Sequence, residues 1–266
     1  MHLCFSDNRD IAMSFVSGPP KWRGSAPRGK PGEPMNVSLP VGPVPLDPAQ
    51  RAAPQVYDWL RTQILALNYA PGTTLSRAEL MRRFGLSQTP IRDALIRLSG
   101  EGLIDIFPQA ATRVSAIDLH QAKQTHFMRR ALELEVVRTL ALADDKPVLR
   151  GLRATIAAQE SALAEPNLDG FDASDRAFHR ILCEGAGVPD LWDLILRRSG
   201  HIDRLRRLDL PSPGKMEAIL ASHRAIVDAI AASNAAAAQD HLRVHLSGTL
   251  AHIDEIRAAY PDYVRG

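Results

Sequence analysis

Two side chains of types that commonly bind metal ions lie one helical turn apart in the middle of the sequence. Asp175 and His179 are four residues apart, in the segment Asp-Arg-Ala-Phe-His. On a helix this spacing places both side chains on one face, where a carboxylate and an imidazole can reach the same cation. An ion pair or a helix cap would explain the same spacing, so the pair alone does not establish a metal site.

Further imidazoles that would complete such a site lie on two later segments. His223 lies on or beside an apolar stripe over residues 219–227, and His245 lies on the last long helical segment. His241 precedes His245 by four residues, so these two form an alternative metal-binding pair. The periodicity of the sequence does not decide which of them faces inward. Five other histidines are interpreted as surface or satisfied core residues: His2, His120, His126, His201 and His252.

A second group of polar side chains lies at the start of a helix predicted near residue 90. Gln88 and Arg92 are four residues apart and project together from its first turns. An arginine can bind a guanine edge through two hydrogen bonds, and a glutamine can bind an adenine edge. The N–H groups at the helix start, with the Ser87 and Thr89 hydroxyls, can bind phosphate. The sequence leaves open which of these two residues caps the helix.

The elements around this helix predict a winged helix-turn-helix. Helices are predicted from about residue 55 to the Pro-Gly at 71–72, over 77–84 and over 87–99, followed by strands over 103–107 and 111–115 with a turn at 108–110. In the third helix, Ile91, Leu95 and Leu98 must face the core. That requirement leaves Gln88, Arg92 and Arg97 on other faces, where they can contact DNA.

From residue 118 onward the sequence has only helical periodicity, interrupted by proline, glycine and asparagine, which predicts about six helices. The predicted fold is therefore mainly α, with an N-terminal winged helix-turn-helix and a C-terminal all-α bundle. We assign residues 1–50 to a disordered extension rich in proline and glycine, residues 51–116 to a DNA-binding domain and residues 118–262 to an effector- and metal-binding domain.

The amino-acid composition limits the classes of protein to which this chain can belong. The 266 residues are 45% hydrophobic and 23% charged, and no apolar run approaches the roughly 18 residues of a membrane-spanning helix. The first twenty residues lack a secretory signal, and the two cysteines cannot form a disulfide framework or a four-thiolate zinc site. These features favour a cytoplasmic protein without a membrane partner. The net charge of +2 does not identify a partner, but arginines outnumber acidic residues in segment 51–115.

The N-terminal segment resembles the GntR family of bacterial transcription regulators. The resemblance lies in residues 70–75, 79–80, 85–95 (Gly-Leu-Ser-Gln-Thr-Pro-Ile-Arg-Asp-Ala-Leu) and 98–104. It implies that the module binds operator DNA as a homodimer and that Ser87, Thr89 and Arg92 contact the DNA. Gln88 replaces the arginine usual in the family, which implies a shift from guanine towards adenine. Ala111 replaces the usual glycine of the wing tip, which brings into question how deeply the wing enters the minor groove.

Residues from about 121 to 250 are similar to the effector-binding domain of the FadR-type subfamily, called the FCD domain. The matching residues are Arg-Arg-Ala-Leu-Glu at 129–133, Asp175 with Phe-His-Arg at 178–180, and His223 with Ile226 and Ala229. Many members bind a divalent metal ion through one aspartate and three histidines. The resemblance places these ligands at Asp175, His179, His223 and His245, and it excludes His241.

Three imidazoles and one carboxylate suit a borderline cation, for which we expect zinc or nickel. A carboxylate effector can bind at an open position of such an ion, in line with the organic-acid effectors that the resemblance implies. Arg129 is the candidate for a second contact to that anion, because a guanidinium group binds a carboxylate through two hydrogen bonds. A surface position, or pairing with Glu133 one turn later, would equally explain Arg129. We expect Glu133 itself near the interface between the domains.

The leading hypothesis is a ligand-responsive transcriptional regulator, not an enzyme. The alternative is a metal-dependent hydrolase that uses the Asp/His cluster to activate water. Against it, no unligated carboxylate is evident near the cluster to act as a base, and a hydrolase does not need a winged helix-turn-helix. A third interpretation makes the metal ion purely structural.

Overall fold

The structure is a computed structural model that describes residues 42–107, 111–165 and 167–266. The predicted extension up to residue 41 and the predicted turn at 108–110 lie outside the described residues. Within those ranges, no helix combines the length and the apolar character that crossing a bilayer requires.

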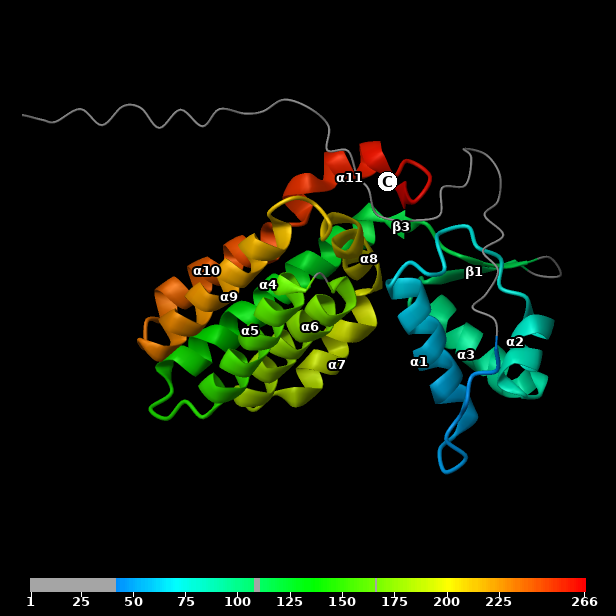
Figure 1. The fold of residues 1–266 in the computed structure, drawn as a ribbon, viewed down its shortest axis with the longest axis horizontal. Helices are drawn as coiled ribbons and strands as arrows, with labels where there is room; N and C mark the ends of the chain where they lie inside the picture. Colours follow the sequence, from blue (N-terminus) through cyan, green and yellow to red (C-terminus); the bar gives the residue numbers. More distant parts are fainter. Residues whose placement is uncertain (1–41, 108–110, 166) are drawn as a thin grey trace, which may run out of the picture. The chain divides into compact units, whose positions relative to one another are not determined.

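The first part of the described chain is a winged helix-turn-helix, as predicted (Figure 1). It consists of helices α1 (Ala52–Leu65), α2 (Arg77–Phe84) and α3 (Gln88–Gly100), then strands β1 (Ile104–Ile106) and β2 (Thr112–Val114). The two strands pair antiparallel, with Ile104 opposite Val114. The buried side chains of α1, α3 and β1 form one apolar core, which includes Leu60, Ile64, Ile91, Leu95, Leu98 and Ile104.

The short helix α2 has clear start and stop signals in its sequence. The Ser76 Oγ accepts a hydrogen bond from the backbone N–H of Glu79 at 3.3 Å, which satisfies one of the unpaired N–H groups of the first turn. At the other end, Gly85 has a φ of 64°, a left-handed conformation that glycine adopts without steric cost. These two residues explain why the predicted bounds of α2 agree with the structure.

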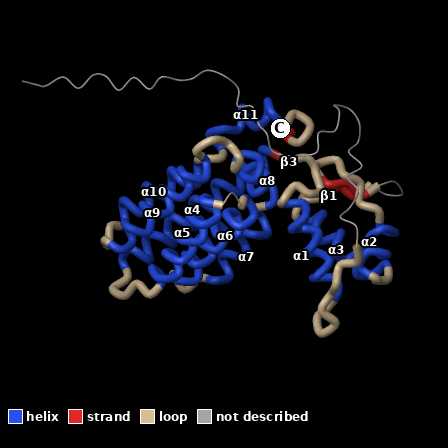
Figure 2. Tube along the Cα trace, in the orientation of Figure 1, coloured by secondary structure: helices blue, strands red, loops and turns tan. Residues whose placement is uncertain are grey.

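The second part of the described chain is a helical bundle (Figure 2). Its long first helix α4 (Leu119–Leu142) contacts α6, α8, α9 and α10. Most of the buried apolar residues of this part form one core cluster. The remaining helical elements are α5 (Val148–Ala164), α6 (Leu168–Gly185), α7 (Pro189–Arg198), α8 (Gly200–Asp209), α9 (Lys215–Ala231), α10 (Ala235–Ser247), the 3-10 turn η1 (Leu250–His252) and α11 (Ile253–Ala259).

The expected number of about six helices in this domain is too low, because the described residues after 118 form α4 to α11. The predicted interruptions at proline, glycine and asparagine all coincide with helix ends. The additional break separates α7 from α8 at Ser199, whose φ of −78° and ψ of −6° are close to helical values. Such a small change of direction leaves no recognisable sequence signal. The short helix α11, seven residues long, was also missed.

A second, very small sheet holds the segment between the two parts. Strand β3 (Ile117–Asp118) pairs in parallel with β4 (Val264–Arg265), and the Ile117 N–H donates to the Tyr263 carbonyl at 2.7 Å. Helix α8 holds the same segment, because Arg204 donates to the Ser115 carbonyl at 2.7 Å and His201 Nδ1 accepts from the Asp118 N–H at 2.9 Å. Two-residue strands have no alternating pattern, so the sequence did not predict this sheet.

Candidate metal centre and DNA-binding surface

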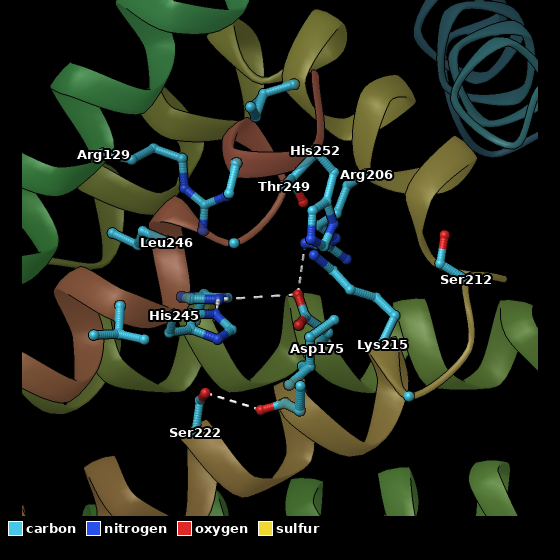
Figure 3. A pocket seen from close by; sticks show the side chains of 18 of the residues that line it. Arg129, Asp175, Arg206, Ser212, Lys215, Ser222, His245, Leu246, Thr249 and His252 are labelled. Carbon is cyan, nitrogen blue, oxygen red and sulfur yellow. Dashed lines mark hydrogen bonds and ion pairs between the residues drawn. The ribbon is translucent and has the colours of Figure 1, made fainter. Parts of the chain in front are cut away.

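Three helices of the bundle bring the four predicted metal ligands together. Asp175 and His179 lie on α6, His223 on α9 and His245 on α10 (Figure 3 labels Asp175 and His245). One ligand atom from each residue lies within 4.8 Å of the others. His179 Nε2 is 3.1 Å and His223 Nε2 is 3.3 Å from His245 Nε2. Nearest oxygens of Asp175 lie 3.9 Å from His179 Nε2 and 3.7 Å from His223 Nε2.

Buried acceptors behind two of the imidazoles fix which ring nitrogen faces the cluster. The Glu133 carboxylate lies 2.5 Å from His179 Nδ1, and the Gln159 Oε1 atom lies 2.9 Å from His223 Nδ1. A carboxylate and an amide oxygen only accept hydrogen bonds, so each Nδ1 carries the proton. In the neutral rings, the Nε2 lone pairs of His179 and His223 therefore point into the cluster. Such buried partners orient metal-binding histidines.

This arrangement fits a divalent metal ion. A neutral His245 can donate at most one Nε2 proton, so at least one of the two lone pairs that point at it lacks a full hydrogen bond unless a cation lies between the rings. A tetrahedral ion with bonds of about 2.1 Å separates neighbouring ligand atoms by about 3.4 Å, close to the nitrogen–nitrogen distances observed. The buried Nδ1 of His245 has no hydrogen-bond partner among the described residues.

The local electrostatics favour the protonation states that metal binding requires. Burial lowers the pKa of His223 and of His245 well below the usual value of 6.5, which keeps both rings neutral at neutral pH. Burial alone would raise the pKa of Asp175, but the charge of Arg206 opposes burial and the pKa is lowered. With His223 and His245 neutral and Asp175 ionised, these three side chains are in the protonation states that bind a metal ion.

A cavity of about 300 Å³ opens beside the cluster (Figure 3). Asp175, His179 and His245 line it together with the cationic side chains Arg129, Arg206 and Lys215. The volume is at the lower end of the range for small-molecule sites. The cavity thus joins the potential metal ligands to a space for a small ligand.

Arg129 both pairs with Glu133 and lies where it can contact a ligand, the two roles that the sequence left open. Its Nε donates to Glu133 at 2.7 Å, as expected for neighbours one turn apart, but the residue is buried and lines the cavity. Its Nη2 atom is buried and has no hydrogen-bond partner within the described chain. A guanidinium group with an unused donor beside a metal cluster is well placed to bind an anion.

Glu133 is not near the interface between the domains, so that expectation was wrong. The side chain is fully buried between Arg129 and His179, behind the metal cluster. Burial would raise the pKa of Glu133, but Arg129 and His179 lower it well below its usual range. Glu133 is thus an unligated carboxylate beside the cluster, contrary to the argument made against a hydrolase. Because its pKa is so low, however, it is a weak base.

Sequence reasoning missed Arg206, which completes the charged wall of the cavity. Its Nη1 atom lies 2.7 Å from Asp175 Oδ2, and it also binds Asp172. Arg206 lies on α8, which the sequence did not separate from α7, so nothing in the pattern placed it opposite α6. His241 is exposed and lies outside the cluster, so the structure brings His245 rather than His241 to the other ligands.

The start of α3 presents its polar side chains to solvent. Ser87, Gln88, Thr89 and Arg92 are all exposed. Ser87 is the N-cap residue, which the sequence left undecided, but its hydroxyl makes no capping hydrogen bond. The exposed hydroxyl and the N–H groups of the first turn are therefore available to a phosphate.

Arg97 differs from the other predicted DNA contacts. Its guanidinium carbon lies 3.6 Å from the centre of the Tyr57 ring, so the side chain packs against α1. Such a cation–π contact stabilises the packing of α3 on α1. The role of Arg97 in DNA binding stays a prediction.

Comparison with known proteins identifies both parts of the chain. Residues 52–114 match the family model described as bacterial regulatory proteins of the gntR family, and residues 124–248 match the FCD domain. An HTH-type transcriptional regulator in an unstable DNA locus of Streptomyces ambofaciens is 34% identical over 78% of this chain and 87% of its own length. The HTH-type transcriptional repressor RspR of Escherichia coli K12 is 31% identical over 82% of this chain and 96% of its own length.

Solved structures share the fold at low sequence identity. Escherichia coli McbR/YncC superposes with a TM-score of 0.67 at 19% identity and covers 79% of this chain and 99% of its own. A GntR regulator, described as putative, from Rhodococcus sp. RHA1 gives 0.64 at 21% identity and covers 78% and 98%. The matched families and relatives are transcriptional regulators rather than enzymes. The chain therefore belongs to the GntR family of bacterial transcriptional regulators, with a winged helix-turn-helix that binds DNA and an FCD domain.

Proposed function

We propose that this regulator binds operator DNA as a homodimer and releases or engages it when a small carboxylate binds beside a metal ion. The metal ligands proposed are Asp175, His179, His223 and His245, and the ion is zinc or nickel. The observation that carries the proposal is the convergence of these four ligands on a cavity that also contains the unused donor of Arg129. When bound, the ion supplies positive charge and a coordination position for the carboxylate.

The proposed DNA contacts lie at the start of α3. Arg92 and Gln88 read base edges in the major groove, and Ser87 and Thr89 bind phosphates, with Arg97 as a further contact. The exposure of the first four side chains supports this assignment. Because GntR regulators bind as dimers, two copies of α3 must match two half-sites about 34–36 Å apart, and a small rotation of either copy weakens binding.

Helix α8 offers a physical connection between the cavity and the DNA-binding domain. Arg206 and Ile202 face the cavity, whereas Arg204 and His201 hold the segment that enters the bundle from β2. A ligand that draws Arg206 away from Asp175 therefore acts on the same helix that fixes residues 115–118. We propose that α8 has two positions, with and without ligand, and that its movement changes DNA binding.

The proposal is tested with fluorescently labelled promoter DNA of the chain's own gene and the full-length protein. Titrations use metal-free, zinc-loaded and nickel-loaded samples, each with and without a panel of short carboxylic acids. We expect specific binding at low ionic strength, and a change of affinity with an acid only in a metal-loaded sample. The His223→Ala variant should bind the DNA but lose this response. Equal responses in metal-free protein, or in the variant, would contradict the proposal.

A further inference from the structure

We infer that the cavity contains a second subsite, formed by residues other than the metal ligands, that selects a hydroxyl group. It consists of Lys215, His252 and Thr249, with Asp209 behind them, and we call it the hydroxyl subsite. The inference rests on the proposed function, because it assumes that a carboxylate of the same ligand binds at the metal centre. It makes the effector a small hydroxylated monocarboxylate.

The hydroxyl subsite is built on a buried carboxylate. Asp209 is only 2% exposed, and its two oxygens hold Lys215 Nζ at 2.5 Å and His252 Nδ1 at 3.1 Å. These residues come from three elements, because Asp209 ends α8, Lys215 begins α9 and His252 lies in η1. Lys215, Thr249 and His252 line the cavity, and Figure 3 shows Lys215 and His245 on opposite sides of Asp175. His252 had no special role in the interpretation from sequence, whereas the proposed subsite assigns it one.

The charges around the cavity argue against a second carboxylate on the ligand. Each cationic side chain that lines the cavity already has a carboxylate partner: Arg129 pairs with Glu133, Arg206 with Asp175 and Lys215 with Asp209. Without a metal ion, the lining offers little uncompensated positive charge. A ligand carboxylate at Lys215 would therefore meet the negative charge of Asp209 without a further cation to offset it.

The hydrogen-bonding groups match a hydroxyl. Lys215 only donates hydrogen bonds. His252 donates through Nδ1 to Asp209, so in the neutral ring its Nε2 atom accepts. A hydroxyl group can accept from Lys215 and donate to His252, whereas a carboxylate only accepts and a methyl group does neither. Thr249 adds a hydroxyl of its own to the cavity lining.

Space limits the ligand to a small molecule. A cavity of about 300 Å³ does not hold a long acyl chain, and Ile202 and Ile219 form apolar parts of its wall. A small cavity that combines apolar wall residues with polar groups suits a short carbon chain that carries polar substituents. One end carries the carboxylate, and a hydroxyl lies farther along the chain.

The experiment compares straight-chain acids of about four to six carbons in three matched forms: unsubstituted, with a terminal hydroxyl and with a second terminal carboxylate. Calorimetry on the nickel-loaded full-length protein gives the affinity of each acid. At the best chain length we expect the hydroxy acid to bind at least about tenfold more tightly than both other forms, as for one well-formed hydrogen bond. Because each comparison uses the same loaded protein, the contribution of the metal ion cancels.

Variants then assign the preference to the hydroxyl subsite. His252→Phe should reduce the preference for the hydroxy acid over the unsubstituted acid to less than about threefold. Lys215→Met combined with Asp209→Leu removes both partners of the ion pair, which avoids an unpaired buried charge, and should have the same effect. Lys123→Met, at an exposed position of α4, is the matched control and should retain the preference.

The possible failures are distinguishable. If the unsubstituted or the dicarboxylic form binds as tightly as the hydroxy acid at every length, the hydroxyl subsite is refuted while carboxylate sensing stands. Retention of the preference in both subsite variants would also refute it. If none of the acids binds to metal-loaded protein that still binds its promoter, the proposed carboxylate sensing itself fails, and this inference fails with it.

Discussion

The DNA-binding surface and the cavity of the FCD domain carry their functional side chains in opposite ways. At the start of α3, Gln88 and Arg92 are exposed and project from a helix whose core face is formed by other residues. In and behind the metal cluster, Asp175, His223 and Glu133 are at most 1% exposed, and each depends on a neighbour for a proton or a countercharge. The functional side chains of the DNA-binding domain thus lie outside its apolar core, whereas those of the FCD domain are part of the buried interior.

This difference has an energetic consequence. An exposed polar side chain exchanges water for DNA, and its removal leaves the fold intact. A buried charge that loses its partner stays desolvated and unpaired, which costs several kcal/mol. The cavity should therefore couple ligand binding to stability, whereas the DNA-binding surface should not.

The largest effect is expected for Arg206→Met, which leaves Asp175 buried without its closest positive charge. We expect the metal-free protein to lose about 3–5 kcal/mol of its free energy of unfolding, measured by urea denaturation. Arg207→Met is the matched control on the same helix. Its partner Asp169 is exposed, so a loss below about 1 kcal/mol is expected. Equal losses in the two variants would show that burial of the carboxylate partner does not determine the cost.

A slightly smaller effect is expected from pH at His201, which holds the segment that leads into the bundle. Burial lowers the pKa of His201 from 6.5 to about 4. The unfolded chain therefore takes up this proton at a higher pH than the folded protein does, and stability falls as the pH drops from about 6.5 towards 4. The loss attributable to His201 approaches about 3 kcal/mol at the lower end.

Urea denaturation of the metal-free protein at a series of pH values measures this loss as the difference between wild type and His201→Gln. A glutamine can accept the Asp118 hydrogen bond but does not titrate, so its stability should fall less steeply with acid. Parallel pH profiles for the two proteins would show that His201 is not the cause.

Glu133→Gln should lower the affinity for the metal ion in addition to destabilising the fold. The amide can still contact His179 but carries no charge, so the imidazole becomes a weaker ligand and Arg129 loses its partner. We expect zinc or nickel affinity to fall by about 10–100-fold, measured by competition with a chromophoric chelator. Glu135→Gln, which changes an exposed carboxylate on the same helix, provides the reference. Unchanged affinity in Glu133→Gln would separate this residue from the metal centre.

The smallest effect on stability is expected for Arg92→Ala, at the exposed start of α3. Its free energy of unfolding should change by less than about 0.5 kcal/mol. Its affinity for the specific promoter fragment should nevertheless fall by about 1–3 kcal/mol, measured by fluorescence anisotropy. Wild-type affinity in this variant would exclude Arg92 as a base-reading residue.

The sequence predicted those features that have local signals. The N-cap Ser76 and the left-handed Gly85 mark the ends of α2, and apolar spacing identified the buried face of α3. The four residues of the metal cluster were named through the family resemblance, since spacing alone left His241 and His245 equivalent. Only the packing of α10 against α4 and α9 shows that His245 faces inward.

The features that were missed depend on contacts between distant segments. Arg206 reaches Asp175 because α8 packs across α4, and Glu133 reaches His179 because α4 packs against α6. Neither pair has a fixed separation in the sequence that a pattern could reveal. The break between α7 and α8 is equally hidden, because its backbone angles differ little from those of a helix.

The pairing of β4 with β3 affects how regulators of this architecture can be recombined. The matches to the two family models leave residues 115–123 and 249–266 uncovered, yet these stretches touch each other and border both the cavity and the DNA-binding module. A chimaera that joins the sensor of one relative to the DNA-binding module of another must therefore carry the matching tail along with the linker.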